Sequence, residues 1–322
     1  MKNKNQIFII PLIAFLLSTI FYIGFISSFN NFGLSNNRFI NSQKMYDNIS
    51  ENTILFLGDS QIREDINCLI IDSEQTNCLN LGIAGILPIQ IALEKNKIIS
   101  AKPKTIIFGI SPLFFNENIN KNDDFLFFMD SNKILRDNLI INQLTDKEEK
   151  ILNMDRKDWI LYKRKFLLPF YINFLKRSEP PKEIRYIEND FKNPYYFTEQ
   201  KTQKELIEKT EDKTILNYFN MKNTSQRQWN SFSYLIEELN QAGIKVIILQ
   251  MPLNPLLTEK LNRTSTSNYY HRLFDINGRH NITLIDLETE FSAEHFNDLT
   301  HLNNLGRDKL SKKISEGDYY II

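Results

Sequence analysis

The stretch Thr53-Ile-Leu-Phe-Leu-Gly58-Asp59-Ser60 decides the fold that we predict for this chain of 322 residues. Residues 54–57 form a short, continuous apolar run, and a Gly-Asp-Ser tripeptide follows it directly. A run of this length without alternating polar residues is typical of a strand buried on both faces of a parallel sheet. We therefore expect Ser60 at a strand-to-loop junction, with its hydroxyl exposed at the carboxyl edge of the sheet.

Four further segments read as strands, at 78–82, 104–109, 244–250 and 282–286. Helices are predicted between or after them, at 88–100, 224–241 and 302–314. The first of these helices begins with Pro88 and the second is followed by Gly243, which are common residues at those positions. Strands that alternate with helices predict right-handed βαβ units and a parallel sheet covered on both faces, which is an α/β fold.

Residues from about 113 to 223 interrupt this alternation and are rich in aromatic residues, Lys and Asn. We predict a mainly helical insertion, with helical pieces at 159–176 and 200–209. An insertion at this point commonly forms a cap over the strand ends, where ligands bind. The alternatives are a packing appendage, or a segment at 159–175 that rests on a membrane surface.

The N-terminal segment predicts a membrane anchor. Lys2 and Lys4 precede an apolar run at 7–29, and no further charged residue occurs before Arg38. A helix of about 22 residues spans about 33 Å, which is enough to cross a bilayer. The flanking lysines favour a cytoplasmic N-terminus. We therefore predict a single-pass anchor at 1–30, a tether at 31–50 and an outward-facing domain at 51–322; a cleaved signal peptide is the alternative.

Composition narrows the function classes. The chain has 39 basic and 39 acidic side chains, and this balance gives no electrostatic footprint for nucleic acid. Four scattered histidines without an HExxH motif give no metal site, so neither a metal nor a cofactor is predicted. The two cysteines, Cys68 and Cys78, are compatible with a disulfide in an extracytoplasmic domain or with two buried free thiols.

A second motif, Asp298-Leu-Thr-His301, lies shortly before the last predicted helix. A serine hydroxyl is a weak nucleophile at neutral pH and needs a base. An Asp three residues before a His can hold its Nδ1–H, which leaves Nε2 to take the serine proton. Ser60, Asp298 and His301 are therefore the candidate catalytic residues. His295 is the competing base, and we rank it below His301.

Taken together, these features resemble the SGNH-hydrolase superfamily: Gly58-Asp59-Ser60, Asn80-Leu-Gly82-Ile-Ala-Gly85, the glycine after the third strand, and Asp298 with His301. The resemblance covers about 51–112 and 244–314. It implies a flavodoxin-like three-layer α/β/α sandwich and the hydrolysis or transfer of acyl esters. It also implies Ser60 as nucleophile, and Gly85 rather than Gly82 as an oxyanion donor beside the Ser60 N–H.

The chain departs from the family in its third motif. Gly109-Ile-Ser111-Pro112 stands where the family has Gly-x-Asn-Asp, so a Ser111 hydroxyl would replace the Asn donor. The same departure marks a membrane-anchored branch that resembles the teichoic-acid D-alanyl transfer protein and the alginate O-acetylation proteins. This favours an esterase or acyltransferase acting on acetyl-like esters of cell-surface polysaccharide, with a multi-pass membrane acyltransferase as partner. The alternative is a non-catalytic, membrane-anchored surface or assembly protein.

Overall fold

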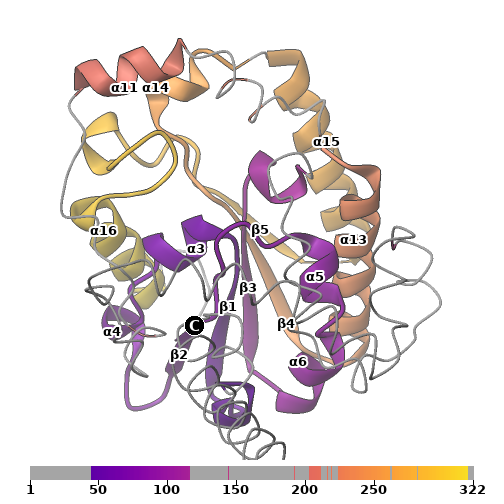
Figure 1. Cartoon of the computed structure of the whole chain (residues 1–322). Helices are drawn as coiled ribbons and strands as arrows, with labels where there is room; N and C mark the ends of the chain where they lie inside the picture. The colour runs from indigo at the N-terminus through magenta and orange to yellow at the C-terminus, as the bar shows by residue number, and fades with distance from the viewer. Residues whose placement is uncertain are drawn as a thin grey trace, which may run out of the picture.

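Within the residues that the structure describes, a five-stranded parallel sheet forms the centre of the computed structural model (Figure 1). The strands lie in the order β2-β1-β3-β4-β5, and each neighbouring pair is parallel. Their bounds are β1 (Thr53–Gly58), β2 (Asn77–Asn80), β3 (Thr105–Ile110), β4 (Lys245–Gln250) and β5 (Thr283–Asp286). This is the order of a flavodoxin-like sheet, in which ligands bind at the carboxyl ends of the strands where the winding reverses, between β1 and β3.

The described residues are 45–116, 203–211, 224–261, 263–280 and 282–317, together with residues 144, 192, 216 and 219. The predicted membrane anchor at 1–30 and the helical piece at 159–176 lie outside them, as does most of the tether at 31–50. Among the described helices, none is long and apolar enough to cross a bilayer. The anchor and the membrane topology therefore stay predictions.

Alternate side chains of the strands enter two separate hydrophobic cores. Leu55 and Leu57 of β1 belong to one core, and Ile54 and Phe56 belong to the other. The first core contains α5 (Pro88–Ala92), α6 (Lys95–Ala101), α13 (Gln226–Gln241) and α15 (Arg263–His280), and the second contains α3 (Ser60–Asp65), α4 (Cys68–Ile71) and α16 (Asn304–Ser315). Figure 1 shows these two groups on opposite sides of the sheet. Burial on both faces explains the continuous apolar runs of the strands.

All five predicted strands are confirmed, and their bounds differ from the prediction by at most two residues. The helix predicted at 88–100 is instead two helices, α5 and α6, separated at Leu93 and Glu94. Helix α15 was not predicted, although its buried residues Tyr269, Leu273 and Ile276 recur at helical spacing. The other short elements are η1 (Tyr46–Asn48), η2 (Pro112–Phe115), α14 (Pro255–Thr258) and η5 (Ala293–His295).

Helix α3 packs directly on the ends of β1 and β3 because a glycine lies at each of these positions. Gly58 pairs in register with Gly109. A Cβ on Gly109 would lie 2.1 Å from Cδ1 of Ile62, and a Cβ on Gly58 would lie 2.5 Å from the carbonyl oxygen of Gly109. Gly58 also has a φ of +154°, which residues with a side chain rarely adopt. The two glycines therefore determine where α3 lies, and α3 begins with Ser60.

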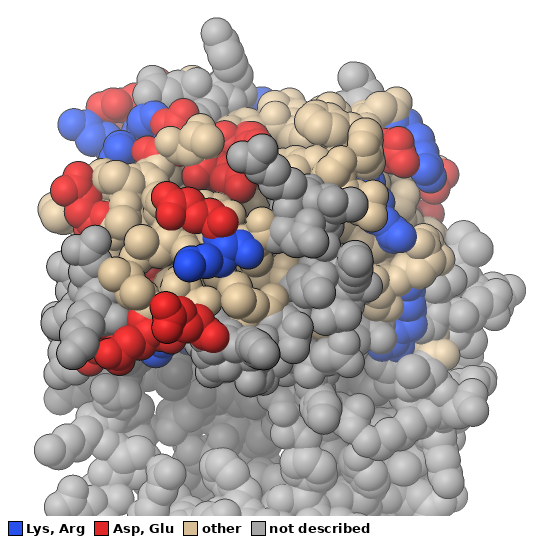
Figure 2. Space-filling view, turned by 90° about the horizontal axis from the view of Figure 1, so that it is seen from above, with Lys and Arg blue, Asp and Glu red and all other residues tan. Residues whose placement is uncertain are grey.

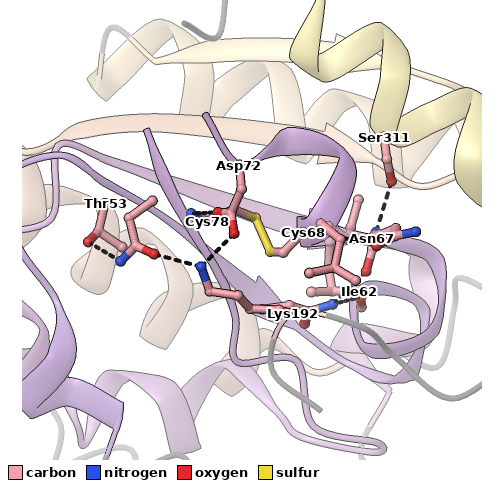
Figure 3. Close-up of a disulfide and its surroundings, with 12 residues drawn as sticks. Thr53, Ile62, Asn67, Cys68, Asp72, Cys78, Lys192 and Ser311 are labelled. Atoms are coloured by element: carbon pink, nitrogen blue, oxygen red, sulfur yellow. Dashed lines mark hydrogen bonds and ion pairs between the residues drawn. A yellow bond between two sulfur atoms is a disulfide. The ribbon is translucent and has the colours of Figure 1, made fainter. Parts of the chain in front are cut away.

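The two cysteines form a disulfide between α4 and β2, with a Cα–Cα distance of 5.2 Å. Of the two alternatives that the sequence leaves open, the structure shows the bonded one. Figure 3 shows Lys192, which belongs to the predicted insertion, beside this disulfide. Its Nζ lies 2.5 Å from Oδ2 of Asp72 and 3.0 Å from Oδ1 of Asn77. The segment between α4 and β2 is therefore one place where a residue of the predicted insertion contacts the sheet domain.

A small third core lies at the carboxyl end of the sheet. Helix α11 (Gln203–Thr210), close to the helical piece predicted at 200–209, packs on α14. Leu206 and Leu257 join Leu299 in this cluster. Leu299 follows Asp298 directly, so one helix of the predicted insertion belongs to the same cluster as the Asp298–His301 loop.

Replacing Gly109 with alanine should destabilise the fold, because the added Cβ would overlap the Ile62 side chain. Overpacking of this kind costs roughly 1–3 kcal/mol. Gly278→Ala is the matched control, since its Cβ would meet no neighbouring atom within 4 Å. Replacing a glycine within a helix stabilises by roughly 0.5–1 kcal/mol. Urea unfolding should therefore shift the two midpoints in opposite directions, and a Gly109→Ala variant as stable as the parent would contradict the tight packing of α3.

Candidate active site

Ser60 is the first residue of α3 and follows the end of β1 by two residues. The helix is capped by Asp59, whose Oδ1 accepts the backbone N–H of Gln61 at 2.9 Å. Asp59 is buried, whereas Ser60 is partly exposed. The strand end and the capped helix together place the serine hydroxyl at the carboxyl edge of the sheet, where the sequence pattern predicts it.

A tight turn brings the Asp298 carboxylate and the His301 imidazole to the same side of the chain. Oδ1 of Asp298 accepts the backbone N–H groups of Thr300 and His301, each at 2.8 Å. The N–H of Asn297 donates to the carbonyl oxygen of His301 at 2.9 Å, which closes the loop. An Asp side chain commonly forms such turns with the backbone two or three residues ahead. The spacing of the Asp-x-x-His motif is therefore the spacing that this turn requires.

The loop places His301 against both Asp298 and Ser60. Nδ1 of His301 lies 3.0 Å from Oδ2 of Asp298, and Nε2 lies 2.9 Å from Oγ of Ser60. Because a carboxylate only accepts hydrogen bonds, Nδ1 carries a proton and donates it. In the neutral ring, Nε2 is then free to accept the proton of the Ser60 hydroxyl. The structure thus brings together three residues that lie up to 241 positions apart.

Electrostatic coupling shifts the pKa values of this pair. Burial lowers the pKa of His301, but the hydrogen bond and charge of Asp298, with the charge of Asp65, raise it more, to about 9. Burial raises the pKa of Asp298, but the hydrogen bond and charge of His301 hold it below its ordinary value. At neutral pH the resting site therefore holds an imidazolium beside a carboxylate. The proton on Nε2 must leave before His301 can act as a base.

Two backbone N–H groups beside this site have no hydrogen-bond partner among the described residues: those of Ser60 and Gly85. The loop that contains Gly85 runs beside the serine turn, since the Ile83 N–H donates to the last carbonyl of β1 at 2.9 Å. The N–H of Gly82, in contrast, donates to Oδ1 of Asn80 at 3.0 Å. Of the two glycines in this motif, Gly85 is therefore the one whose N–H is available to a ligand.

Ser111 lies just beyond β3, next to β1, but its hydroxyl is withdrawn from solvent. The residue is completely buried, and its Oγ has no hydrogen-bond partner in the described part of the chain. Its carbonyl oxygen accepts the N–H of Phe114 in η2. A buried hydroxyl without a partner is uncommon. The structure thus places Ser111 at the predicted edge of the sheet, although beneath the surface that Ser60 reaches.

His295, the competing base, has a different partner. Its Nδ1 lies 2.8 Å from Oγ of Ser292 in an exposed turn, and its ring packs edge-on against Phe291. His280 has its Nε2 3.0 Å from Oγ of Ser233, on the opposite helical layer. Among the four histidines, His301 is the one that contacts the Ser60 hydroxyl.

No group of three His, Cys, Asp or Glu side chains in the described ranges is placed to hold a metal ion. A groove of about 580 Å³ lies between α13 and α15, and Trp229, Ser231 and Arg272 are among its lining residues. It lies on the helical layer opposite α3 and includes none of the three residues brought together at Ser60.

Figure 2 views the molecule from above, where acidic and basic side chains are interspersed with uncharged ones.

No protein-family model matches the chain, and no curated protein matches its sequence. Among solved structures, it resembles one named "putative platelet activating factor" from Streptococcus pneumonia, with a TM-score of 0.39 and 11% sequence identity. The match covers 92% of this chain and 98% of the other. At this TM-score the likeness supports no conclusion about function, which is therefore inferred from the geometry of the site.

The raised pKa of His301 predicts that the reactivity of Ser60 rises with pH, with a midpoint at about 9. Only the unprotonated imidazole can accept the serine proton, so reactivity is low below the midpoint. Protonation of His301 stabilises the fold at low pH, and this contribution is lost as pH rises through about 9.

NMR titration of the His301 imidazole checks this pKa directly. In Asp298→Asn the charge that raises the pKa is gone, so the midpoint should fall toward the ordinary histidine value of about 6.5. A parent protein that already titrates at the ordinary value would contradict the coupling between the two side chains.

Proposed function

We propose that this chain is an extracytoplasmic serine esterase or O-acyltransferase of the SGNH type, in which Ser60 carries the acyl group. The observation that supports this most directly is the hydrogen-bonded path from Asp298 through His301 to Oγ of Ser60, with steps of 3.0 and 2.9 Å. Such a path occurs on unrelated folds and is recognised by its geometry. Its place at the carboxyl ends of parallel strands agrees with the family resemblance of the sequence motifs.

In the first half-reaction, Oγ of Ser60 attacks the carbonyl carbon of an acyl ester while Nε2 of His301 takes the hydroxyl proton. The tetrahedral intermediate then collapses, and the bond to the leaving alkoxide breaks. His301 returns the proton to that alkoxide, so the products are a free alcohol and an ester on Ser60. Asp298 holds the imidazole in the required tautomer and stabilises its charge throughout.

In the second half-reaction, His301 removes a proton from an incoming hydroxyl group, which attacks the acyl carbon on Ser60. The tetrahedral intermediate then collapses, the bond between the acyl carbon and Oγ of Ser60 breaks, and His301 returns the proton to Oγ. Water in this role gives hydrolysis, and a sugar hydroxyl gives transfer. The outcome depends on how well acceptor binding excludes water. We assign the choice between water and a sugar hydroxyl to the proposed cap between β3 and β4. Helix α11 of this segment contributes Leu206 to the same hydrophobic cluster as Leu299, beside the Asp298–His301 loop.

The negative oxygen of the tetrahedral intermediate needs donors, and we assign the N–H groups of Ser60 and Gly85 to this role. Neither has a hydrogen-bond partner among the described residues. Ser111 is the third proposed donor, in place of the family's Asn. Its burial means that Oγ reaches the oxyanion only if the substrate enters below the surface.

The proposed substrates are acetyl-like esters of cell-surface polysaccharide. The proposed location is the outer face of a membrane, held by the predicted anchor at 1–30. A multi-pass membrane acyltransferase would supply the acyl group in the transfer reaction, and no cofactor is required by either half-reaction. These assignments rest on the motifs and on the apolar N-terminal run.

A fluorophosphonate probe tests the proposed nucleophile. The parent should be labelled on Ser60, Ser60→Ala should not be labelled, and His301→Ala should react at least about 10²–10⁴-fold more slowly because the general base is gone. His295→Ala is the matched control and should react like the parent. Intact-protein mass spectrometry over time gives the rates. A folded parent that is not labelled above pH 9, where His301 is neutral, would instead favour the non-catalytic surface or assembly protein.

Ser111→Ala tests the third oxyanion donor. If Oγ of Ser111 donates to the oxyanion, ester turnover should fall by about 10²-fold with little change in substrate binding, because the lost interaction forms only in the transition state. Steady-state kinetics on a p-nitrophenyl ester separates kcat from KM. Unchanged kcat would remove Ser111 from the site and leave the two backbone donors.

A further inference from the structure

Side chains of α3 bind the His301 loop on both sides of that histidine. Nε2 of Gln61 donates to the carbonyl oxygen of Thr300 at 2.8 Å, and Oδ1 of Asp65 accepts the N–H of Leu302 at 2.9 Å. These two groups belong to the peptide bonds immediately before and after His301. The helix that begins with the proposed nucleophile therefore holds the backbone of the proposed base.

Helical geometry explains why both side chains reach the same loop. Gln61 and Asp65 are four residues apart and so lie on one face of α3. Nε2 of Gln61 also donates to the carbonyl oxygen of Pro252, just after β4, at 3.0 Å. Since both of its partners are carbonyl oxygens, which only accept, the orientation of the Gln61 amide is defined. This one side chain joins α3, the end of β4 and the His301 loop.

Burial of these two side chains argues against a purely stabilising role. Gln61 is 1% exposed and Asp65 is completely buried. Oε1 of Gln61 and Oδ2 of Asp65 have no hydrogen-bond partner among the described residues. Burying polar atoms without partners costs free energy, and apolar side chains of similar volume often replace such groups at no loss of stability. What the two polar side chains supply instead is a defined position for the loop.

We propose that Gln61 and Asp65 are positioning residues, which hold His301 at hydrogen-bond distance from Ser60. This inference rests on the function proposed above for Ser60 and His301. Neither side chain is hydrogen-bonded to the Ser60 hydroxyl or to the His301 ring, so both position His301 through the backbone of the loop, and Asp65 in addition raises the pKa of His301 by its charge. A misplacement of about 1 Å at a catalytic group can cost about 10²-fold in rate.

Substitutions of similar volume test this role in the full chain. Gln61→Met and Asp65→Leu remove the hydrogen bonds to the loop, whereas Asp65→Asn keeps an acceptor oxygen for the Leu302 N–H. Inactivation by a fluorophosphonate is measured over a range of probe concentrations, which separates reversible binding from formation of the bond to Ser60. We expect bond formation to slow by about 10²-fold in the first two variants, with binding unchanged. At a pH well above 9, where His301 is neutral with or without the Asp65 charge, Asp65→Asn should react at nearly the rate of the parent.

Asn67→Ala is the matched control. Asn67 is also buried and follows α3, but its side chain accepts the N–H of Leu69 and donates to Asp308, away from the His301 loop. This variant should have a lower unfolding midpoint and an unchanged rate of bond formation. The proposal is overturned if folded Gln61→Met and Asp65→Leu react like the parent, or if Asn67→Ala slows the reaction as much as they do.

A second readout separates failure of this inference from failure of the proposed function. A folded parent that is not labelled would overturn the function, and the imidazole NMR signals of His301, identified by their loss in His301→Ala, would then decide the positioning role. These signals should shift or broaden in Gln61→Met and Asp65→Leu but not in Asn67→Ala. Signals that are the same in all of these proteins would overturn the positioning role.

Discussion

The contact of Ile62 with the glycine ends of two neighbouring strands is the constraint on which the rest of the site depends. Gly58 and Gly109 pair in register, and a Cβ on either would overlap atoms already present. The contact determines how close α3 comes to the sheet, and hence where the proposed nucleophile lies. It also turns the face of α3 that carries Gln61 and Asp65 toward the loop of the proposed base. The position of this one short helix therefore determines where both the proposed nucleophile and the loop of the proposed base lie.

Charge is the second element of the site. The Asp298 carboxylate raises the pKa of His301 to about 9, so the resting pair is an ion pair, partly shielded from water. An acyl donor that displaces water and lets the imidazole lose its proton would convert the pair to its reactive form. The proposed oxyanion site has two available backbone N–H groups and a buried Ser111, which is a weaker set of donors than one with an Asn side chain. Slow turnover in water and faster transfer under a bound acceptor are consistent with that arrangement.

The sheet could be predicted because strands buried on both faces read as continuous apolar runs, and β1 has the predicted bounds. Helix α15 was missed because few apolar residues mark its buried face among many polar ones. Residue types and chain order identified Ser60 and His301, but their contact across 241 positions required the fold. Gln61 and Asp65 gave no sequence signal, since their partners are backbone groups of a distant loop. The sequence did not decide between a Cys68–Cys78 disulfide and two free thiols for a similar reason, because the bond depends on how α4 packs beside β2.

Trapping the acyl-enzyme is the measurement that tests the central claim most directly. The full chain would be mixed with an activated acetyl ester, quenched in acid within the first turnover and digested. Mass spectrometry of the peptides would then locate the acetyl group. We predict one acetyl group on Ser60 in the parent and none at that position in His301→Ala under the same conditions. An acetyl group on another residue, or a folded parent that carries none while the ester is consumed, would contradict the proposed role of Ser60.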